Sequence, residues 1–210
     1  MKVDLHVHTN YSSCSILKID TLKKLCKKFD IYPAITDHNV IAGAKKFKNC
    51  ILGEEIMTKE GEIIGLFLNG QIKKGLSIEE TIDKIKEQGG IVYVPHPFDW
   101  RRRSQVKRTN FKMDMIEVFN GRIWQQSLNE KAKEFAKKNK ITMGVGSDTH
   151  TPFELGRIYN EIEEFNSPKE FLKNMKKAKL VTCNQGVLTQ FRVNVISGTR
   201  KWILKPLKIV

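Results

Sequence analysis

The sequence has few cysteines, and their spacing excludes both a disulfide framework and a thiolate zinc knuckle. Its 210 residues contain four cysteines, Cys14, Cys26, Cys50 and Cys183, and no CxxC pair. Scattered thiols of this kind are typical of reduced cysteines in a cytosolic protein. We therefore expect a cytoplasmic location. Cys14 is of interest only because it follows two histidines closely.

Long apolar runs and domain linkers are also missing. No hydrophobic stretch approaches the roughly 20 residues that span a bilayer. Residues 1–6 are charged and carry an imidazole, unlike the apolar core of a signal peptide. No internal repeat, low-complexity tract or linker rich in Gly, Ser or Pro divides the chain. We therefore expect a single catalytic domain over residues 1–210, without membrane association.

Acidic residues are scarce relative to basic ones. The chain has 23 Asp and Glu against 37 Lys and Arg, which gives a formal net charge of +14. A positive field favours polyanionic ligands and steers phosphate-bearing molecules toward the protein. Much of the excess is paired lysine, such as Lys23 and Lys24, typical of solvated helix surfaces. The denser run from Arg101 to Arg103 is the better candidate for a functional basic patch.

Short apolar runs alternate with segments of helical period. Strands are expected near residues 3–7, 31–36, 51–57, 63–68, 91–94, 115–119, 141–145 and 180–183. Helices are expected after a capping box at Ser77, after Ser167 and Pro168, and along the apolar stripes within residues 22–29 and 123–136. The alternation predicts an α/β fold of right-handed βα units with a mainly parallel sheet, open or closed into a barrel.

All five histidines lie at or just beyond the end of an expected strand. They are His6, His8, His38, His96 and His150. Ligands of parallel α/β folds bind at the carboxyl ends of the strands, so these imidazoles are expected along one edge of the sheet. One such histidine is more often a hydrogen-bonded structural residue. Five at the same edge favour a metal site.

The spacing within the chain supports this interpretation. Residues i and i+2 of a strand share a face, so His6 and His8 are expected side by side. Asp148 and His150 would be placed in the same way if their segment is extended. Prolines on both sides of His96 exclude a helix interior there and favour an extended or turn conformation.

Carboxylates complete the set of candidate ligands. Glu54 and Glu55 are adjacent in an expected strand and point to opposite faces, so only one of them can face the site. A carboxylate between two cations can bridge them. Imidazole and carboxylate ligands without thiolate predict Mn, Zn or Fe and exclude a cysteine-based structural zinc site.

Six short motifs together resemble those of the PHP (polymerase and histidinol phosphatase) family. They are residues 4–9 (DLHVHT), 36–38 (TDH), 53–56 (GEEI), 95–97 (PHP), 116–120 (IEVFN) and 146–150 (GSDTH), in the family's order. The resemblance implies a distorted (β/α)7 TIM-like barrel of the PHP type. It also implies two or three divalent metal ions (Mn, Zn or Fe) at the carboxyl ends of the strands, and the activity of a metal-dependent phosphoric ester hydrolase.

The resemblance further implies a role for each motif residue. The first metal would be held by His6, His8, Glu55 and Asp148, and Glu55 would bridge to a second metal held by His96. His38 and His150 would hold a third. Glu55 is chosen over Glu54 because the glutamate of the family's GxE motif is the ligand. Catalytic roles are expected for Glu55, Asp148 and His150, and supporting contacts to the ligands for Asp4, Asp37, Glu117 and Asn120. Independently of the resemblance, guanidinium chemistry makes phosphate-binding candidates of Arg101, Arg102, Arg103, Arg122 and Arg157.

The sequence departs from the family pattern in two places. The family often has an acidic or imidazole ligand shortly after the HxH motif, where this chain has Ser12, Ser13 and Cys14. Many members also have a histidine between the GxE and HP motifs, and residues 56–95 contain none. The third metal and the remaining ligand of the second site therefore stay open.

The expected reaction is hydrolysis of a phosphomonoester or phosphodiester by metal-activated water. The substrate would be a nucleotide, a nucleic-acid end or a small phosphorylated metabolite. One alternative is a basic nucleic-acid-binding module with a structural or vestigial metal centre, which the low aromatic content of 9% and the lack of an RNP signature disfavour. A second is an amidohydrolase-like metal hydrolase, which the HP and SDxH motifs fit less well. The sequence does not settle the oligomeric state.

Overall fold

The computed structural model describes residues 1–183, so the last part of the expected domain 1–210 lies outside the described residues. Its strands are β1 (Lys2–Val7), β2 (Ile31–Ile35), β3 (Ile51–Thr58), β4 (Gly61–Leu66), β5 (Ile91–Val94), β6 (Met115–Asn120), β7 (Thr142–Gly146), β8 (Tyr159–Glu161) and β9 (Lys179–Val181). Its helices are α1 (Ile19–Phe29), α2 (Ala42–Phe47), α3 (Ile78–Glu87), α4 (Gln126–Asn139) and α5 (Pro168–Met175).

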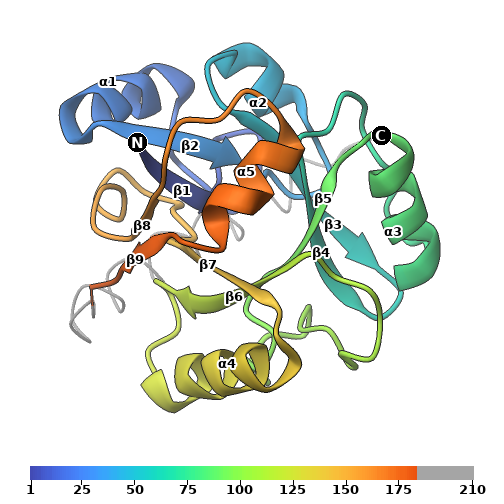
Figure 1. Ribbon diagram of the computed structural model, residues 1–210. Coiled ribbons are helices and arrows are strands. Elements are labelled where there is room, and N and C mark those ends of the chain that lie inside the picture. Colours follow the sequence, from blue (N-terminus) through green and yellow to red (C-terminus); the bar gives the residue numbers. More distant parts are fainter. Residues whose placement is uncertain (184–210) are drawn as a thin grey trace.

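The strands form one sheet in the order β7-β6-β5-β4-β3-β2-β1-β8-β9, which curves into a nearly closed barrel (Figure 1). The seam closes just beyond β1 and β7. His8 N donates to the carbonyl oxygen of Thr149 at 2.9 Å, and Thr149 N donates to that of His6 at 3.3 Å. The expected barrel-shaped α/β fold is confirmed.

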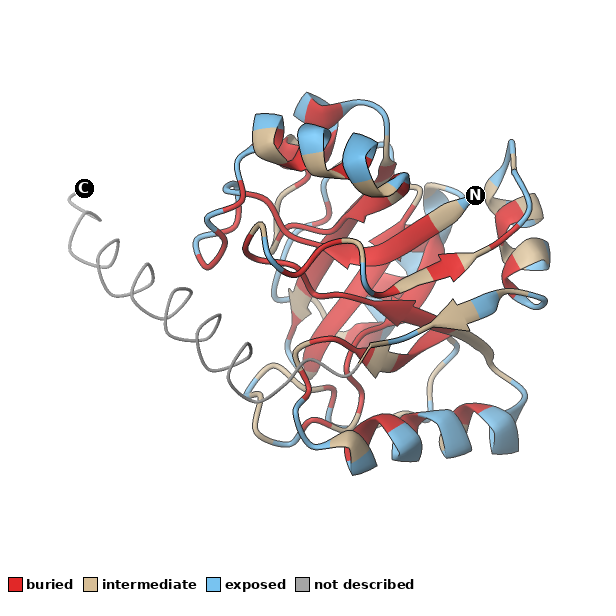
Figure 2. Cartoon of the chain, turned by 90° about the vertical axis from the view of Figure 1, so that its left-hand side faces the viewer, coloured by how far each residue is buried: buried red, intermediate tan, exposed pale blue. Residues whose placement is uncertain are grey.

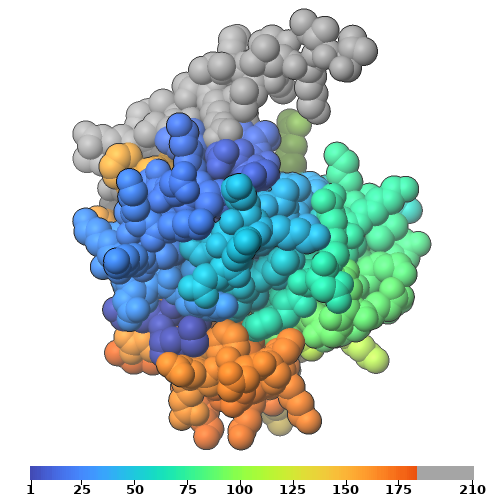
Figure 3. All heavy atoms as spheres, turned by 90° about the horizontal axis from the view of Figure 1, so that it is seen from above, coloured from blue at the N-terminus to red at the C-terminus, as the bar shows by residue number. Residues whose placement is uncertain are grey.

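The expectation of a mainly parallel sheet is wrong. Strand β4 is antiparallel to both β3 and β5, and β8 is antiparallel to β1 and β9. The link from β3 to β4 is a tight hairpin between Thr58 and Gly61, too short for a crossover helix. In Figure 3 the blue N-terminal segment lies beside the orange segment near residue 160, as the pairing of Lys2 with Glu161 requires.

The helix signals at the two serine caps are confirmed. Ser77 Oγ accepts from Glu80 N at 3.2 Å and a Glu80 carboxylate oxygen accepts from Ser77 N at 2.7 Å, so both halves of the capping box at α3 are formed. Gly89, with φ of 72°, follows directly after the C-cap of α3. At α5 the Ser167 hydroxyl accepts from Glu170 N at 3.2 Å, which is the serine half of such a cap.

Other boundaries differ from the sequence-based expectation. Helix α4 begins at Gln126, because Ile123 and Trp124 belong to a turn in which Ile123 N donates to the carbonyl oxygen of Asn120. The six-residue helix α2 and the three-residue strand β8 were not expected. Both are too short to show a period in the sequence.

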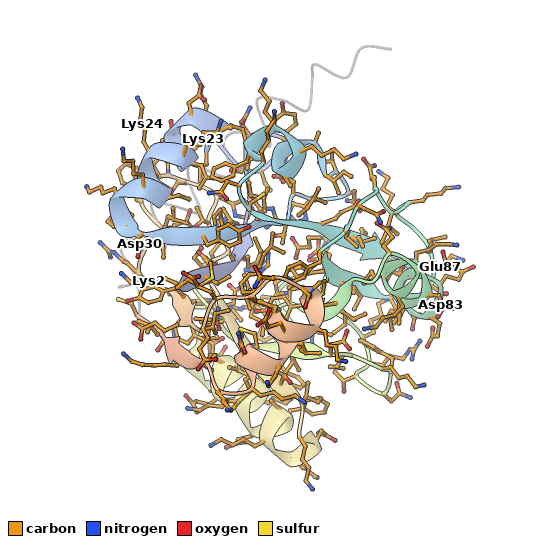
Figure 4. All side chains as sticks on the ribbon, turned by 45° about the horizontal axis from the view of Figure 1, so that its top comes forward. Lys2, Lys23, Lys24, Asp30, Asp83 and Glu87 are labelled. Atoms are coloured by element: carbon orange, nitrogen blue, oxygen red, sulfur yellow. The ribbon has the colours of Figure 1, made fainter. Side chains whose placement is uncertain are left out.

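The barrel strands form the buried core and the helices cover it. Figure 2 shows most of the strands buried and the outer faces of the helices exposed. The labelled side chains Lys23 and Lys24 on α1, and Asp83 and Glu87 on α3, point outward at opposite sides of the molecule (Figure 4). The paired lysines of α1 are therefore solvated, as expected. No helix within residues 1–183 has the length and apolarity needed to cross a membrane.

Candidate metal centre

The five histidines form one cluster at the carboxyl ends of the barrel strands. The ring centre of His8 lies 5.0 Å from that of His6, 4.5 Å from that of His38 and 4.3 Å from that of His150. The rings of His6 and His96 are 5.9 Å apart. A pocket of about 920 Å³ opens over the cluster, and His38 and His150 form part of its wall.

The first group of ligand atoms comes from His6, His8, Glu55 and Asp148. The two Nε2 atoms are 3.0 Å apart. Glu55 Oε2 lies 3.5 Å from His6 Nε2 and 3.2 Å from His8 Nε2, and Asp148 Oδ1 lies 3.6 and 3.5 Å from the same two atoms. Metal–nitrogen bonds of about 2.0–2.1 Å in a tetrahedral site separate neighbouring ligand atoms by roughly 3.3 Å. The four side chains match that spacing.

The hydrogen bonds of the two imidazoles show that this group fits a cation. His6 Nδ1 lies 3.1 Å from Glu117 Oε1, an acceptor, so Nδ1 carries the proton and Nε2 the lone pair. His8 Nδ1 lies 3.2 Å from the hydroxyl of Ser12, which gives its own proton to a nearby carboxylate. When both rings are neutral, as metal ligands are, their lone pairs face each other across 3.0 Å. Asp148 Oδ1 points at them, buried and without a hydrogen-bond partner.

A second group of ligand atoms contains Glu62, which the sequence did not single out. His96 Nε2 lies 3.0 Å from Glu55 Oε1 and 3.7 Å from Glu62 Oε2, while His38 Nδ1 lies 3.0 Å from Glu55 Oε2 and 3.2 Å from Glu62 Oε1. Glu62 is only 3% exposed. Glu62 supplies a carboxylate oxygen to the second group, and residues 56–95 contain no histidine that could do so. The sequence feature that could have identified Glu62 is its position, as an acidic residue directly before the apolar run of residues 63–68.

A third group joins His8, His38 and His150, whose nearest ring nitrogens all lie within 4.8 Å of one another. The segment to His150 is not extended, because Asp148 has φ of 55°. The condition for the side-by-side placement of Asp148 and His150 is therefore not met. The two side chains still lie close, because His150 Nδ1 is 3.4 Å from Asp148 Oδ1 and 2.8 Å from the carbonyl oxygen of Asp148. His96, with φ of 32°, occupies a bend between its two prolines.

The residues expected to support the ligands act in different ways. Glu117 contacts the His6 ring directly and also accepts from His96 N at 2.8 Å. Asn120 Nδ2 donates to Glu117 Oε2 at 2.9 Å and to Asp148 Oδ2 at 3.3 Å. These contacts fix the direction of ligands from three different strand ends.

The two aspartates of the same set do not hydrogen bond to an imidazole. Asp37 accepts from Thr9 and from the Ser12 hydroxyl, so it acts on His8 through Ser12. Asp4 accepts from the backbone N–H groups of His6 and Ser147, at 3.2 and 3.0 Å. Burial raises the pKa of Asp4 to about 7 although these hydrogen bonds lower it. Asp4 therefore joins β1 to the end of β7.

The electrostatics of the cluster favour positive charge at its centre. Burial alone would lower the pKa of His6, but the carboxylates of Asp148, Glu117 and Glu55 outweigh it and hold that pKa well above its ordinary value. Burial would likewise raise the pKa of Glu55, yet His38 and His6 hold it well below the usual range. Carboxylates that stay ionised when buried need cations beside them.

Glu117→Gln tests this support directly. The amide keeps the shape of the side chain but removes the charge that sets the His6 tautomer, so we expect the affinity for the first metal to fall roughly 10–100-fold. Competition of the metal-loaded protein with a chelating dye measures it. A variant that binds metal as tightly as the parent chain would show that Glu117 has no such role.

Four of the five candidate phosphate-binding arginines line the pocket: Arg101, Arg102, Arg103 and Arg122. Arg102 donates to Asp148 Oδ2 at 2.7 Å and to Asp99 Oδ2 at 3.2 Å. Arg101 stacks over the ring of Trp124, 5.1 Å from its centre, and is paired with Asp99. Arg157 is exposed and is not among the residues that line this pocket.

Fold and cluster together define the class, a barrel-shaped α/β protein with a metal-binding cluster at the carboxyl end of its strands. A family model described as PHP-associated matches residues 126–180. Uncharacterized protein MJ0417 of Methanocaldococcus jannaschii is 42% identical over 84% of this chain and 79% of its own length. Protein MJ1587 of the same organism is 42% identical over 66% of this chain and 95% of its own length. The chain belongs to the PHP family.

More distant relatives agree with this assignment. A Clostridium botulinum protein named "Probable phosphatase" is 31% identical over 83 residues, 36% of this chain and 34% of its own length. A two-domain Bacteroides vulgatus protein described as containing a predicted PHP-like metal-dependent phosphoesterase has the same fold, with a TM-score of 0.65, 17% identity and coverage of 92% of this chain and 68% of that one. A Chromobacterium violaceum amidohydrolase also shares the fold, with a TM-score of 0.60, 14% identity and coverage of 82% and 96%. Fold alone therefore does not separate the two reactions.

Proposed function

We propose that the protein is a cytoplasmic hydrolase of phosphoric esters that works with two or three divalent ions, Mn, Zn or Fe. The observation that carries the proposal is the position of Glu55 between two groups of ligands. Its Oε2 lies 3.2 Å from His8 Nε2 and its Oε1 lies 3.0 Å from His96 Nε2. A carboxylate in that position can bridge ions roughly 3.5–4 Å apart, as hydrolytic two-metal sites require.

These contacts support three ligand sets. His6, His8, Glu55 and Asp148 would hold the first ion. Glu55, Glu62 and His96 would hold the second, and His38 with His150 would hold the third. Ions of this kind lower the pKa of a water molecule toward neutrality and neutralise phosphoryl oxygens.

The side chains of the pocket supply the remaining parts of the reaction. Arg102 lies beside the cluster with its guanidinium held by Asp148 and Asp99, so it can receive a phosphate without much reordering. Planar guanidinium groups bind phosphate oxygens through paired hydrogen bonds. Arg101 and Arg122 extend the positive wall of the pocket. These residues orient a phosphate against the ligand cluster.

The pocket wall also favours a substrate with a flat ring. Trp124 is 60% exposed and has the Arg101 guanidinium over its face. An exposed aromatic side chain next to arginines provides a stacking surface for a base. A nucleotide or a nucleic-acid end therefore fits better than a small aliphatic phosphate, and a phosphorylated metabolite with a ring is the third candidate.

An activity screen of the loaded protein tests the proposal. The protein is stripped of metal, reloaded separately with Mn, Zn or Fe, and assayed for phosphate release from phosphomonoesters and for cleavage of oligonucleotides. We expect turnover that disappears on chelation and returns on reloading. Tight oligonucleotide binding without turnover would instead favour a nucleic-acid-binding module. Turnover of cyclic amides alone would favour an amidohydrolase.

A further inference from the structure

Cys14 places a thiol against the histidine cluster. Its side chain is 3% exposed, and its Sγ lies 3.0 Å from His150 Nε2. The loop that carries it is fixed at the next residue, because Ser15 Oγ donates to the carbonyl oxygens of His8 and His150 at 3.2 and 3.0 Å. Ile16 N donates to the same oxygen of His150 at 3.0 Å. The thiol is therefore held at this point of the cluster by backbone and side-chain contacts.

The imidazoles facing Cys14 are oriented as ligands. The Nδ1 of His150 lies 2.8 Å from the carbonyl oxygen of Asp148, an acceptor, so the lone pair of His150 is on Nε2, which faces the sulfur. The ring centres of His38 and His150 are 6.2 Å apart. The ring nitrogens of His38, His150 and His8 lie within 4.8 Å of one another. Nitrogen and sulfur donors thus converge beside Glu55, the carboxylate that would bridge the first two ions.

We propose that Cys14, His38 and His150 form a third cation site in which Cys14 is a thiolate ligand and zinc is the preferred ion. The proposal depends on the metal binding of the proposed function but not on the hydrolysis of phosphoesters. Neutral imidazoles bring no charge to this site, and a thiolate supplies the negative charge that a divalent ion needs. Thiolate is a soft ligand that favours zinc over manganese or magnesium.

The distances are compatible with this coordination. Zinc–nitrogen bonds of about 2.0–2.1 Å and a zinc–sulfur bond of about 2.3 Å place the two ligand atoms roughly 3.5 Å apart in a tetrahedral site. The observed separation of 3.0 Å between Cys14 Sγ and His150 Nε2 is about half an ångström less. A small rotation of the cysteine side chain supplies that difference. The plain alternative is an S–H group that donates to the imidazole and binds no ion.

Cobalt absorption distinguishes a metal-bound thiolate from an S–H group that binds no ion, and it needs no activity assay. The metal-free full chain is titrated with Co²⁺, because a cobalt–thiolate bond gives a charge-transfer band in the near ultraviolet. We expect the band in the parent protein. In Cys14→Ser we expect the band to be lost and total cobalt binding to fall by about one ion per chain. Cys26→Ser is the matched control, because Cys26 is also a buried cysteine but lies on the inner face of α1, in a hydrophobic cluster away from the histidines, and it should keep both signals.

Each outcome bears on a separate claim. A band that persists in Cys14→Ser, or that never appears in the parent protein, overturns the third site. An intact band in a protein that hydrolyses no phosphoester overturns only the proposed function. Should Cys14→Ser fail to fold by circular dichroism, X-ray absorption of the zinc-loaded parent protein decides. A sulfur neighbour at roughly 2.3 Å supports the site, and a shell of nitrogen and oxygen alone contradicts it.

Discussion

Glu55→Gln is expected to abolish hydrolysis of an activated phosphomonoester while leaving the fold unchanged. The amide has nearly the same shape as the carboxylate, but it carries no charge and offers one oxygen, so it cannot bridge two cations. Both Glu55 oxygens face imidazole nitrogens at 3.0–3.2 Å. We expect kcat of the Mn-loaded protein to fall by more than the roughly 10–100-fold typical of residues behind a metal ligand. Elemental analysis should show less bound metal.

Glu54→Gln is the control for this experiment. Glu54 is the neighbouring residue of β3, it points to the other face, and its Oε2 accepts from Ile72 N at 2.9 Å. Glutamine keeps an oxygen for that hydrogen bond, so activity and metal content are expected to stay within about twofold. Full activity in Glu55→Gln would remove Glu55 from the chemistry. Equal losses in both variants would point to disturbance of the strand.

Replacing Glu62 tests the second ion. Glu62→Ala removes the carboxylate that faces His38 and His96, and it is expected to reduce bound metal by about one ion per chain and activity by at least tenfold. Glu62→His restores a ligand of another type, so it should recover most of the metal. Isothermal titration of the metal-free variants with Mn²⁺ or Zn²⁺ measures the number of sites.

The stability of the variants provides the control for Glu62. Glu62 lies on β4, opposite Met57 of β3, within a buried hairpin. Thermal melts in chelator therefore have to be similar for the parent, Glu62→Ala and Glu62→His. An unchanged metal content in Glu62→Ala would show that Glu62 is not a ligand and that the second ion is held by other groups.

The sequence predicted the barrel because each buried strand is a separate apolar run. The runs near residues 91–94 and 115–119 became β5 and β6 almost without change. The reversal of β4 was not predictable in this way, since apolar runs carry no sign of strand direction. Only the short link between Thr58 and Gly61 forces β4 to return antiparallel to β3. The start of α4 was misplaced because Ile123 is buried in a turn.

The sequence predicted those site residues that are typical metal ligands and lie at the ends of expected strands. The alternation that separates Glu54 from Glu55 also followed from elementary strand geometry. Glu62 was missed because it lies one residue before the expected strand. The bend at His96 and the left-handed conformation of Asp148 could not be read from residue types, since both depend on contacts made across the barrel. The thiol of Cys14 belongs to the same class of tertiary detail.

The seam of the barrel links metal loading to the integrity of the whole chain. The first strand and the residue directly after it supply His6 and His8, and the segment after β7 supplies Asp148 and His150. An ion held by both pairs would fasten together parts of the polypeptide about 140 residues apart. Two backbone hydrogen bonds hold that junction beside the ligands, together with the contacts of Ser147 to Asp4 and to the carbonyl oxygen of His6. An ion present at a thousandfold excess over its dissociation constant adds about 4 kcal/mol to folding. The same ions would then hold the barrel closed and take part in the reaction.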